Sequence, residues 1–158
     1  SALVILAVGS GFYLGAPESI PDPDCSAEAA PGVNWRNCRL DGIQLDAAEL
    51  DHALLNNGMI RRAKLSGSKL NDSDLQYVDL SESDLSYAEL KRAAMKGATL
   101  RNTDLSYADL TGADLSFADL TGANLGGAKL QQVRLDNAIW INGALCLPGS
   151  LGSCRVKP

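Results

Sequence analysis

Few side chains in this sequence are of the types that carry out chemistry: four cysteines, one histidine and a regular series of carboxylates. His52, the single histidine, has no serine or cysteine motif around it that would form a nucleophile–base pair. A zinc site is disfavoured, because no two cysteines have the Cys-x-x-Cys spacing and His52 lies far from all of them in the chain. We therefore expect no enzymatic activity, no metal or cofactor and no small-molecule substrate.

Carboxylates recur directly before leucines, and the spacings between them are multiples of five residues. They are Asp74, Asp79, Asp84, Glu89, Asp104, Asp109, Asp114 and Asp119. Paired carboxylates can act as a general acid and a general base. A regular series suits a structural role better, because Asp side chains accept hydrogen bonds from the backbone of tight turns. We expect these side chains to stabilise turns and to solvate the outer surface.

The four cysteines lie near the two ends of the chain, at Cys25, Cys38, Cys146 and Cys154. Three pairings are possible, and the two local bridges, Cys25 with Cys38 and Cys146 with Cys154, need no long-range rearrangement. Each closed loop would add about 2 to 3 kcal/mol of stability in the chain-entropy account. Disulfides indicate an oxidising space outside the cytosol, such as the periplasm or a thylakoid lumen.

The element that must carry these residues repeats every five positions. From Leu40 to Leu135 every fifth residue is leucine, apart from Ile60 and Met95, and a small or modest side chain stands two residues before each. Period five fits neither a helix nor a straight strand, since both would turn successive leucines to different sides. A short extended piece followed by a turn in every pentapeptide would point all of them inward.

The run from Ala108 to Leu125, AlaAspLeuThrGlyAlaAspLeuSerPheAlaAspLeuThrGlyAlaAsnLeu, resembles the pentapeptide-repeat family, and the likeness extends from Ser66 to Leu135. The resemblance implies an all-β fold, a right-handed quadrilateral β-helix (solenoid) with four pentapeptides in each coil. The pentapeptides from Leu40 to Leu135 would then make about five coils.

A solenoid needs caps, because its end coils expose leucines and unpaired backbone groups. Trp35 precedes the first leucine of the series and Trp140 follows the last, so we expect both rings to act as end caps. The stretch from Trp140 to Cys154 is also similar to the closing loop of exported bacterial pentapeptide proteins.

The chain divides into four parts by composition. Residues 1–17 carry no charge and are interpreted either as a membrane anchor, which would form an N-terminal membrane helix, or as the remnant of an export signal. Residues 18–34 form a proline-rich linker and N-terminal cap, residues 35–140 the solenoid and residues 141–158 a C-terminal capping loop.

A net charge of −5 disfavours nucleic-acid binding, which requires an excess of Lys and Arg. Some members of the family imitate duplex DNA and bind DNA gyrase, which is the alternative function for this chain. Such mimicry needs a continuous negative surface. Columns spaced by twenty residues give no such strip, since one reads Arg39, Met59, Asp79, Thr99 and Asp119, and the opposite one reads Glu49, Lys69, Glu89, Asp109 and Lys129.

Outward aromatic residues are the candidate interface: Tyr87 and Tyr107, one coil apart, and Tyr77 and Phe117, two coils apart on the opposite side. They can equally be ordinary ladders that stabilise neighbouring coils. The sequence favours a non-enzymatic scaffold on the periplasmic or lumenal side, an accessory subunit that braces a membrane protein complex. Its partners would be that protein complex and, through residues 1–17, the membrane.

Overall fold

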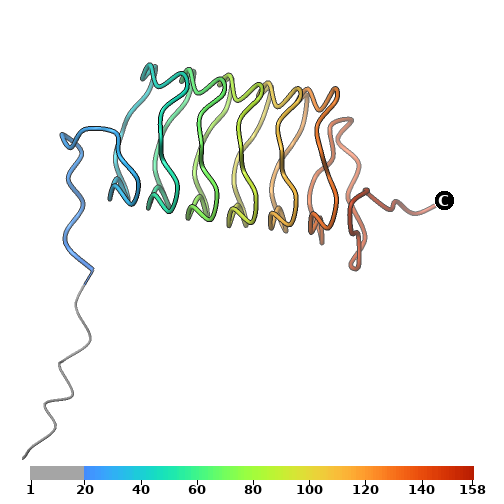
Figure 1. Ribbon diagram of the computed structural model, residues 1–158. Coiled ribbons are helices and arrows are strands. Elements are labelled where there is room, and N and C mark those ends of the chain that lie inside the picture. The colour runs from blue at the N-terminus through green and yellow to red at the C-terminus, as the bar shows by residue number, and fades with distance from the viewer. Residues whose placement is uncertain (1–19) are drawn as a thin grey trace, which may run out of the picture.

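The computed structural model describes residues 20–158, which wind into a rod of stacked coils (Figure 1). The segment interpreted as an anchor or signal remnant, 1–17, lies outside the described residues. Within residues 20–158 there is no helix, and each β-element is a single bridged residue rather than an extended strand. No helix long and apolar enough to cross a membrane is present in this part of the chain.

The coils are joined by parallel bridges between residues twenty positions apart, from Asn34↔Leu54 to Asp119↔Ile139. Four pentapeptides therefore complete one coil, and the bridged residues form four ladders, one on each face of the rod. Face 1 contains Asn34, Leu54, Asp74, Ala94, Asp114 and Arg134. Face 2 contains Arg39, Met59, Asp79, Thr99, Asp119 and Ile139. Face 3 contains Gln44, Lys64, Asp84, Asp104 and Asn124, and face 4 contains Glu49, Lys69, Glu89, Asp109 and Lys129. The two columns predicted from the sequence are thus faces 2 and 4, and their register is confirmed.

The leucine series fills the axis of the rod. Leu85, Leu105 and Leu110 are completely buried, and the small residues two positions earlier, such as Ala108, are buried beside them. A small side chain at this position allows the coil to close tightly around the leucines. The predicted inward phase is confirmed. A narrow apolar void runs along the axis from Trp35 and Leu40 to Leu80.

Each pentapeptide turns through a β-turn. In a typical turn the amide of Ala88 donates to the carbonyl of Leu85 at 3.1 Å. The residue two after each leucine has a positive φ, as at Tyr87 (58°) and Gly97 (67°), which is the third-residue conformation of a type II turn. Because this residue stands at a corner, its side chain points away from the axis. The exposed aromatic residues Tyr77, Tyr87, Tyr107 and Phe117 all stand at such corners.

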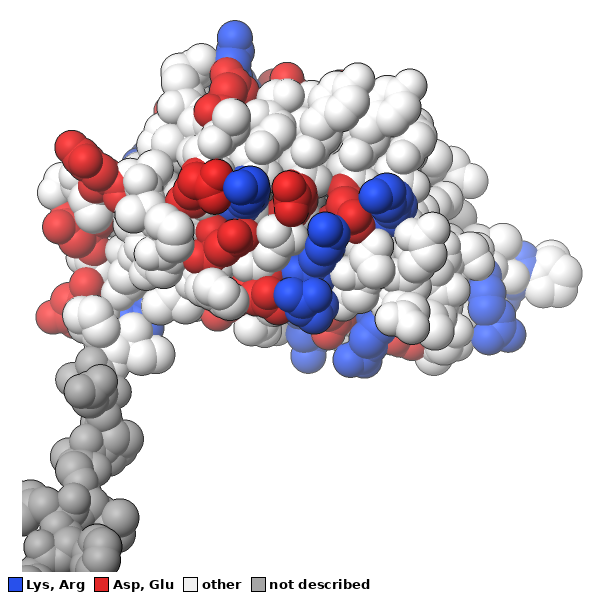
Figure 2. Space-filling view, in the orientation of Figure 1, with Lys and Arg blue, Asp and Glu red and all other residues white. Residues whose placement is uncertain are grey.

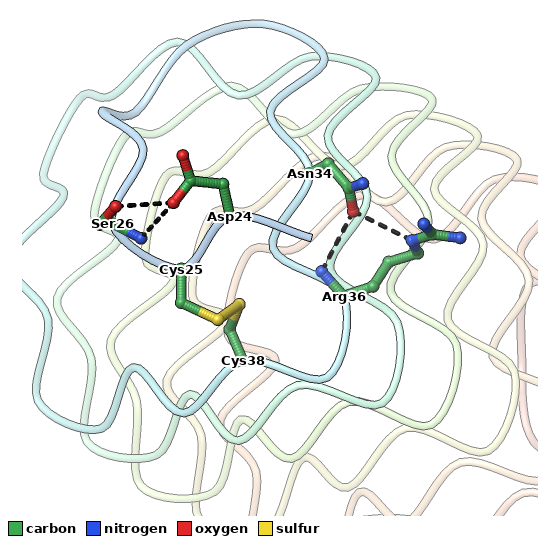
Figure 3. Close-up of a disulfide and its surroundings, with 6 residues drawn as sticks. All are labelled: Asp24, Cys25, Ser26, Asn34, Arg36 and Cys38. Atoms are coloured by element: carbon green, nitrogen blue, oxygen red, sulfur yellow. Dashed lines mark hydrogen bonds between the residues drawn. A yellow bond between two sulfur atoms is a disulfide. The ribbon is translucent and has the colours of Figure 1, made fainter. Parts of the chain in front are cut away.

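The two ends are closed differently. The structure pairs Cys25 with Cys38, beside turns in which Asp24 accepts from Ser26 and Asn34 accepts from Arg36 (Figure 3). Trp35 is buried at this end, with 3% of its surface exposed.

At the C-terminal end the chain leaves the solenoid and turns back. Antiparallel bridges join Arg134 to Leu151 and Ile139 to Leu145, and a second disulfide joins Cys146 to Cys154. Trp140 is only partly buried there. Since Arg134 and Ile139 end faces 1 and 2, the returning segment covers those two faces.

Candidate interaction surface

The aspartates that precede the leucines accept hydrogen bonds within the turns, whereas Glu89 does not. The Oδ1 atom of Asp79 accepts the amide of Ser81 at 3.0 Å and its hydroxyl at 2.6 Å. Asp109 makes the same pair of contacts with Thr111, at 3.1 and 2.6 Å. Burial by itself would raise the pKa of Asp109, but these hydrogen bonds lower it below its usual value. The interpretation of the series as turn-stabilising groups is confirmed for these residues.

Several basic side chains bind carboxylates one coil away. Arg61 donates to both oxygens of Asp41, at 3.1 and 2.9 Å, and this hydrogen-bonded contact lowers the pKa of Asp41 to about 2. Arg92 and Asp72 form the same fork-like pair, at 2.7 and 2.6 Å. These pairs tie successive coils together at the surface.

His52 occupies a corner position with a φ of 60° and is exposed. Its column carries no serine or cysteine nucleophile. Residues 20–158 contain no group of three His, Cys, Asp or Glu side chains placed to hold a metal ion.

Tyr87 and Tyr107 form a stacked pair at the corner between faces 3 and 4. Their ring centroids lie 5.1 Å apart with the planes inclined by 7°. Tyr87 and Tyr107 nevertheless remain 62% and 60% exposed. The next corner residue is Gly127, where a Cβ atom would lie 2.6 Å from Tyr107 Cδ1, so its absence makes room for the ring.

The corner between faces 1 and 2 is built differently. Tyr77 and Phe117 are two coils apart, and the Tyr77 ring lies over Gly97, where a Cβ atom would be 2.5 Å from Tyr77 Cε1. Lys96 places its ammonium group 5.5 Å from the centroid of the Phe117 ring. Tyr77 and Phe117 are therefore exposed on the same corner but do not form a ladder.

The corner that carries the stacked tyrosines lacks charge along most of the rod. Its turn residues are Ser66–Gly67, Ser86–Tyr87, Ser106–Tyr107 and Gly126–Gly127, a set called here the uncharged edge. Each of the other three corners includes charged residues over the same coils, for example Arg61 and Arg62 or Lys91 and Arg92. The uncharged edge was not apparent from the aromatic residues alone. The sequence does contain this signal, because the two residues after Leu65, Leu85, Leu105 and Leu125, spaced by twenty positions, are all uncharged.

A parallel β-solenoid with a five-residue period, held around a leucine axis, defines the class of this protein. The family description "Pentapeptide repeats" matches residues 63–102 and 100–137. The pentapeptide repeat protein Rfr23 of the cyanobacterium Cyanothece 51142 is 30% identical, with a TM-score of 0.59 over 66% of this chain and 88% of that one. This chain belongs to the pentapeptide repeat family, whose members form right-handed quadrilateral β-helices.

Two further solved structures are similar over parts of the chain. A pentapeptide repeat protein from Nostoc PCC 7120 is 48% identical over 49% of this chain and 68% of that one, with a TM-score of 0.29. One from the thylakoid lumen of Arabidopsis thaliana is 25% identical over 62% of this chain and 65% of that one, with a TM-score of 0.36. No curated protein sequence matches this chain.

Proposed function

We propose that this protein is a non-enzymatic scaffold whose uncharged edge binds a partner protein. The observation that carries the proposal is the exposed, stacked pair Tyr87 and Tyr107. Aromatic residues are enriched and charged residues depleted at the centres of protein interfaces. Because these two rings already pack on each other and on a rigid coil, a partner would immobilise little that is not already ordered. Tyr77 and Phe117 lack this arrangement and form a secondary candidate surface.

The compartment proposed is the periplasm or a thylakoid lumen. Two disulfides support this proposal, since such bridges persist in oxidising spaces and are rare in the cytosol. The partner proposed is a membrane protein complex, which the rod would brace as an accessory subunit. Residues 1–17, uncharged and largely apolar, would hold the protein at the membrane.

The charge pattern does not favour imitation of DNA. Face 4 contains both acidic and basic residues, and some of them form ion pairs between coils, with Lys69 Nζ 2.8 Å from Glu49 and Lys129 Nζ 3.3 Å from Asp109. Figure 2 shows both signs interspersed over the middle of the rod on the face in view. A surface that imitates duplex DNA and binds gyrase would instead need an extended negative field.

The test is capture of the partner from detergent-solubilised membranes, using the wild type and the variant Tyr87→Asn/Tyr107→Asn. Asparagine tolerates the positive φ of these corners, so the coil should remain intact while both rings are lost. Glu82→Asn, an exposed residue at another corner with a φ of 61°, is the matched control.

We expect the same membrane proteins to be recovered with the wild type and Glu82→Asn, and to be lost with the double variant. Unchanged recovery with the double variant would remove the uncharged edge as the binding surface. Recovery of gyrase alone, from the cytosolic fraction, would overturn the exported scaffold.

A further inference from the structure

The C-terminal end of the rod is covered on only two of its four faces. In the interior coils the amide of Leu105 donates to the carbonyl of Asn124 at 2.9 Å, and that of Tyr107 donates to Gly126 at 2.8 Å. One coil later, four backbone amides have no hydrogen-bond partner within residues 20–158. Two of them, Leu125 and Gly127, are equivalent to Leu105 and Tyr107. The other two, Leu130 and Gln132, follow on the neighbouring face. The carbonyls of Ala123 and Ala128 are likewise without a partner in this part of the chain. The returning segment leaves faces 3 and 4 as an open sheet edge.

The open edge is also apolar at its inner side. Leu125 and Leu130 are only partly buried, whereas Leu105 and Leu110 in the coil before are completely buried. Both leucines lack a coil above them. We call this combination of Leu125, Leu130 and the adjoining backbone groups the open step. An exposed edge of this kind is a template for another chain, and proteins normally cover it.

The N-terminal end has a matching deficiency. In the second coil the amide of Met59 donates to Cys38 at 2.8 Å, but the amides of Gln44 and Glu49 have no partner among the described residues. Leu40 and Leu45 are only partly buried at this end. Each end of the rod therefore offers backbone groups and leucine surface that its own described chain does not cover.

The two ends have opposite charge. Residues 20–51 contain seven acidic and two basic residues, whereas residues 121–158 contain one acidic and four basic residues. Figure 2 shows acidic side chains gathered at the end where the chain enters the rod and basic side chains at the end where it leaves. Two like ends would repel each other, and unlike ends would attract.

We propose that the open step binds the acidic N-terminal end of a second copy of this chain, so that the rods associate head to tail. Charge favours this orientation over contacts between two N-terminal ends or between two C-terminal ends. The contact itself would bury Leu125 and Leu130 and would pair the backbone groups of the open edge. The contact is heterologous, because different surfaces of the two copies meet. Such contacts extend into chains of copies when they do not close into a ring. The inference does not rest on the uncharged edge.

Two charge-reversed variants of the full chain test it. Arg155→Glu/Lys157→Glu leaves two basic and three acidic residues in residues 121–158, so that both ends are acidic. Asp22→Lys/Glu28→Lys leaves five acidic and four basic residues in residues 20–51, so that most of the negative charge of the N-terminal end is removed. None of these four residues takes part in an ion pair within residues 20–158, so the fold should tolerate the changes. Sedimentation velocity would measure association over a range of protein and salt concentrations.

We expect the wild type to associate with concentration and to dissociate as salt is raised. Each variant alone should associate about tenfold more weakly. An equal mixture of the two should recover association, since one variant keeps the acidic N-terminal end and the other keeps the basic C-terminal end. Hydrogen exchange of residues 123–132 should slow on association of the wild type. Equal association of the wild type and both variants, which is what association through residues 1–17 would give, would overturn the proposal. So would a wild type that stays monomeric throughout.

Discussion

Bulky residues at the corners of the coil adopt a backbone conformation that usually belongs to glycine. Tyr77, Arg92 and Phe117 have φ values of 56°, 55° and 62°. A left-handed residue with a side chain costs about 1 to 2 kcal/mol. The surrounding coil compensates, because each of these amides donates to the following coil, as Tyr77 does to Lys96 at 3.0 Å. The regular ladder, rather than the local preference of each residue, sets the conformation.

Two glycines with the same conformation should respond differently to a methyl group. Gly67 has a φ of 66° and nothing within 4 Å of its missing Cβ, whereas Gly97, with a φ of 67°, lies beneath the Tyr77 ring. Gly67→Ala should cost about 1 kcal/mol from backbone strain alone. Gly97→Ala should cost about 1 kcal/mol more, because the ring must move. Denaturant unfolding would measure both.

A double-mutant cycle provides the control for this prediction. In a Tyr77→Ala background the extra cost of Gly97→Ala should disappear, since the two residues interact directly. An unchanged cost in that background would show that the ring of Tyr77 does not rest on Gly97.

The structural element of this protein is the pentapeptide, which combines one bridged residue, one buried leucine and a turn. Asp104, Leu105 and Ser106 illustrate the division of roles. Asp104 bridges the neighbouring coils at Asp84 and Asn124, Leu105 is completely buried, and Ser106 begins the turn on the outside. A change of one position along the chain therefore moves a residue from the core to the surface.

This division predicts a sharp contrast between neighbours. Leu105→Ala should lower the free energy of unfolding by about 2 to 5 kcal/mol, because leucines above and below cannot fill the hole. Ser106→Ala should change it by only about 0.5 kcal/mol, as expected of a surface position. Thermal or denaturant unfolding decides between them. Equal effects, or the reverse order, would refute the inward phase of the leucines.

At the scale of the whole molecule, the disulfides secure the regions where the repeat stops. Cys38 and Cys146 are buried, with 1% and 0% of their surfaces exposed, so each bridge anchors an irregular segment to the core. Closing such loops stabilises a protein mainly by restricting the unfolded chain.

Protein taken from cells and denatured without reducing agent should therefore show no thiol that reacts with an alkylating reagent. Replacing one pair, by Cys146→Ala/Cys154→Ala, should cost about 2 to 3 kcal/mol and should speed hydrogen exchange at the C-terminal end before the middle of the rod. Four alkylated cysteines in protein from cells would contradict both the bridges and the exported location.

Much of the architecture could be predicted from the sequence because it repeats locally. A leucine at every fifth position with a small residue two before it specifies which side chains enter the core, and one pentapeptide predicts the next. The likeness to the family added four pentapeptides per coil, and from that the ladders of faces 2 and 4 followed. The positive φ of the corners was missed, although Gly42, Gly67 and Gly97 all stand two residues after a leucine-phase position.

Only the tertiary structure decided what happens at the corners and at the ends. Tyr87 meets Tyr107 while Tyr77 rests on Gly97, and this difference depends on which residue the next coil places twenty positions later. The open step depends on where the chain turns back after Trp140, which no repeat specifies. A periodic sequence determines the interior of a solenoid, because every coil has the same neighbours. The ends have neighbours on one side only, so their structure is set by the particular path of the capping segments.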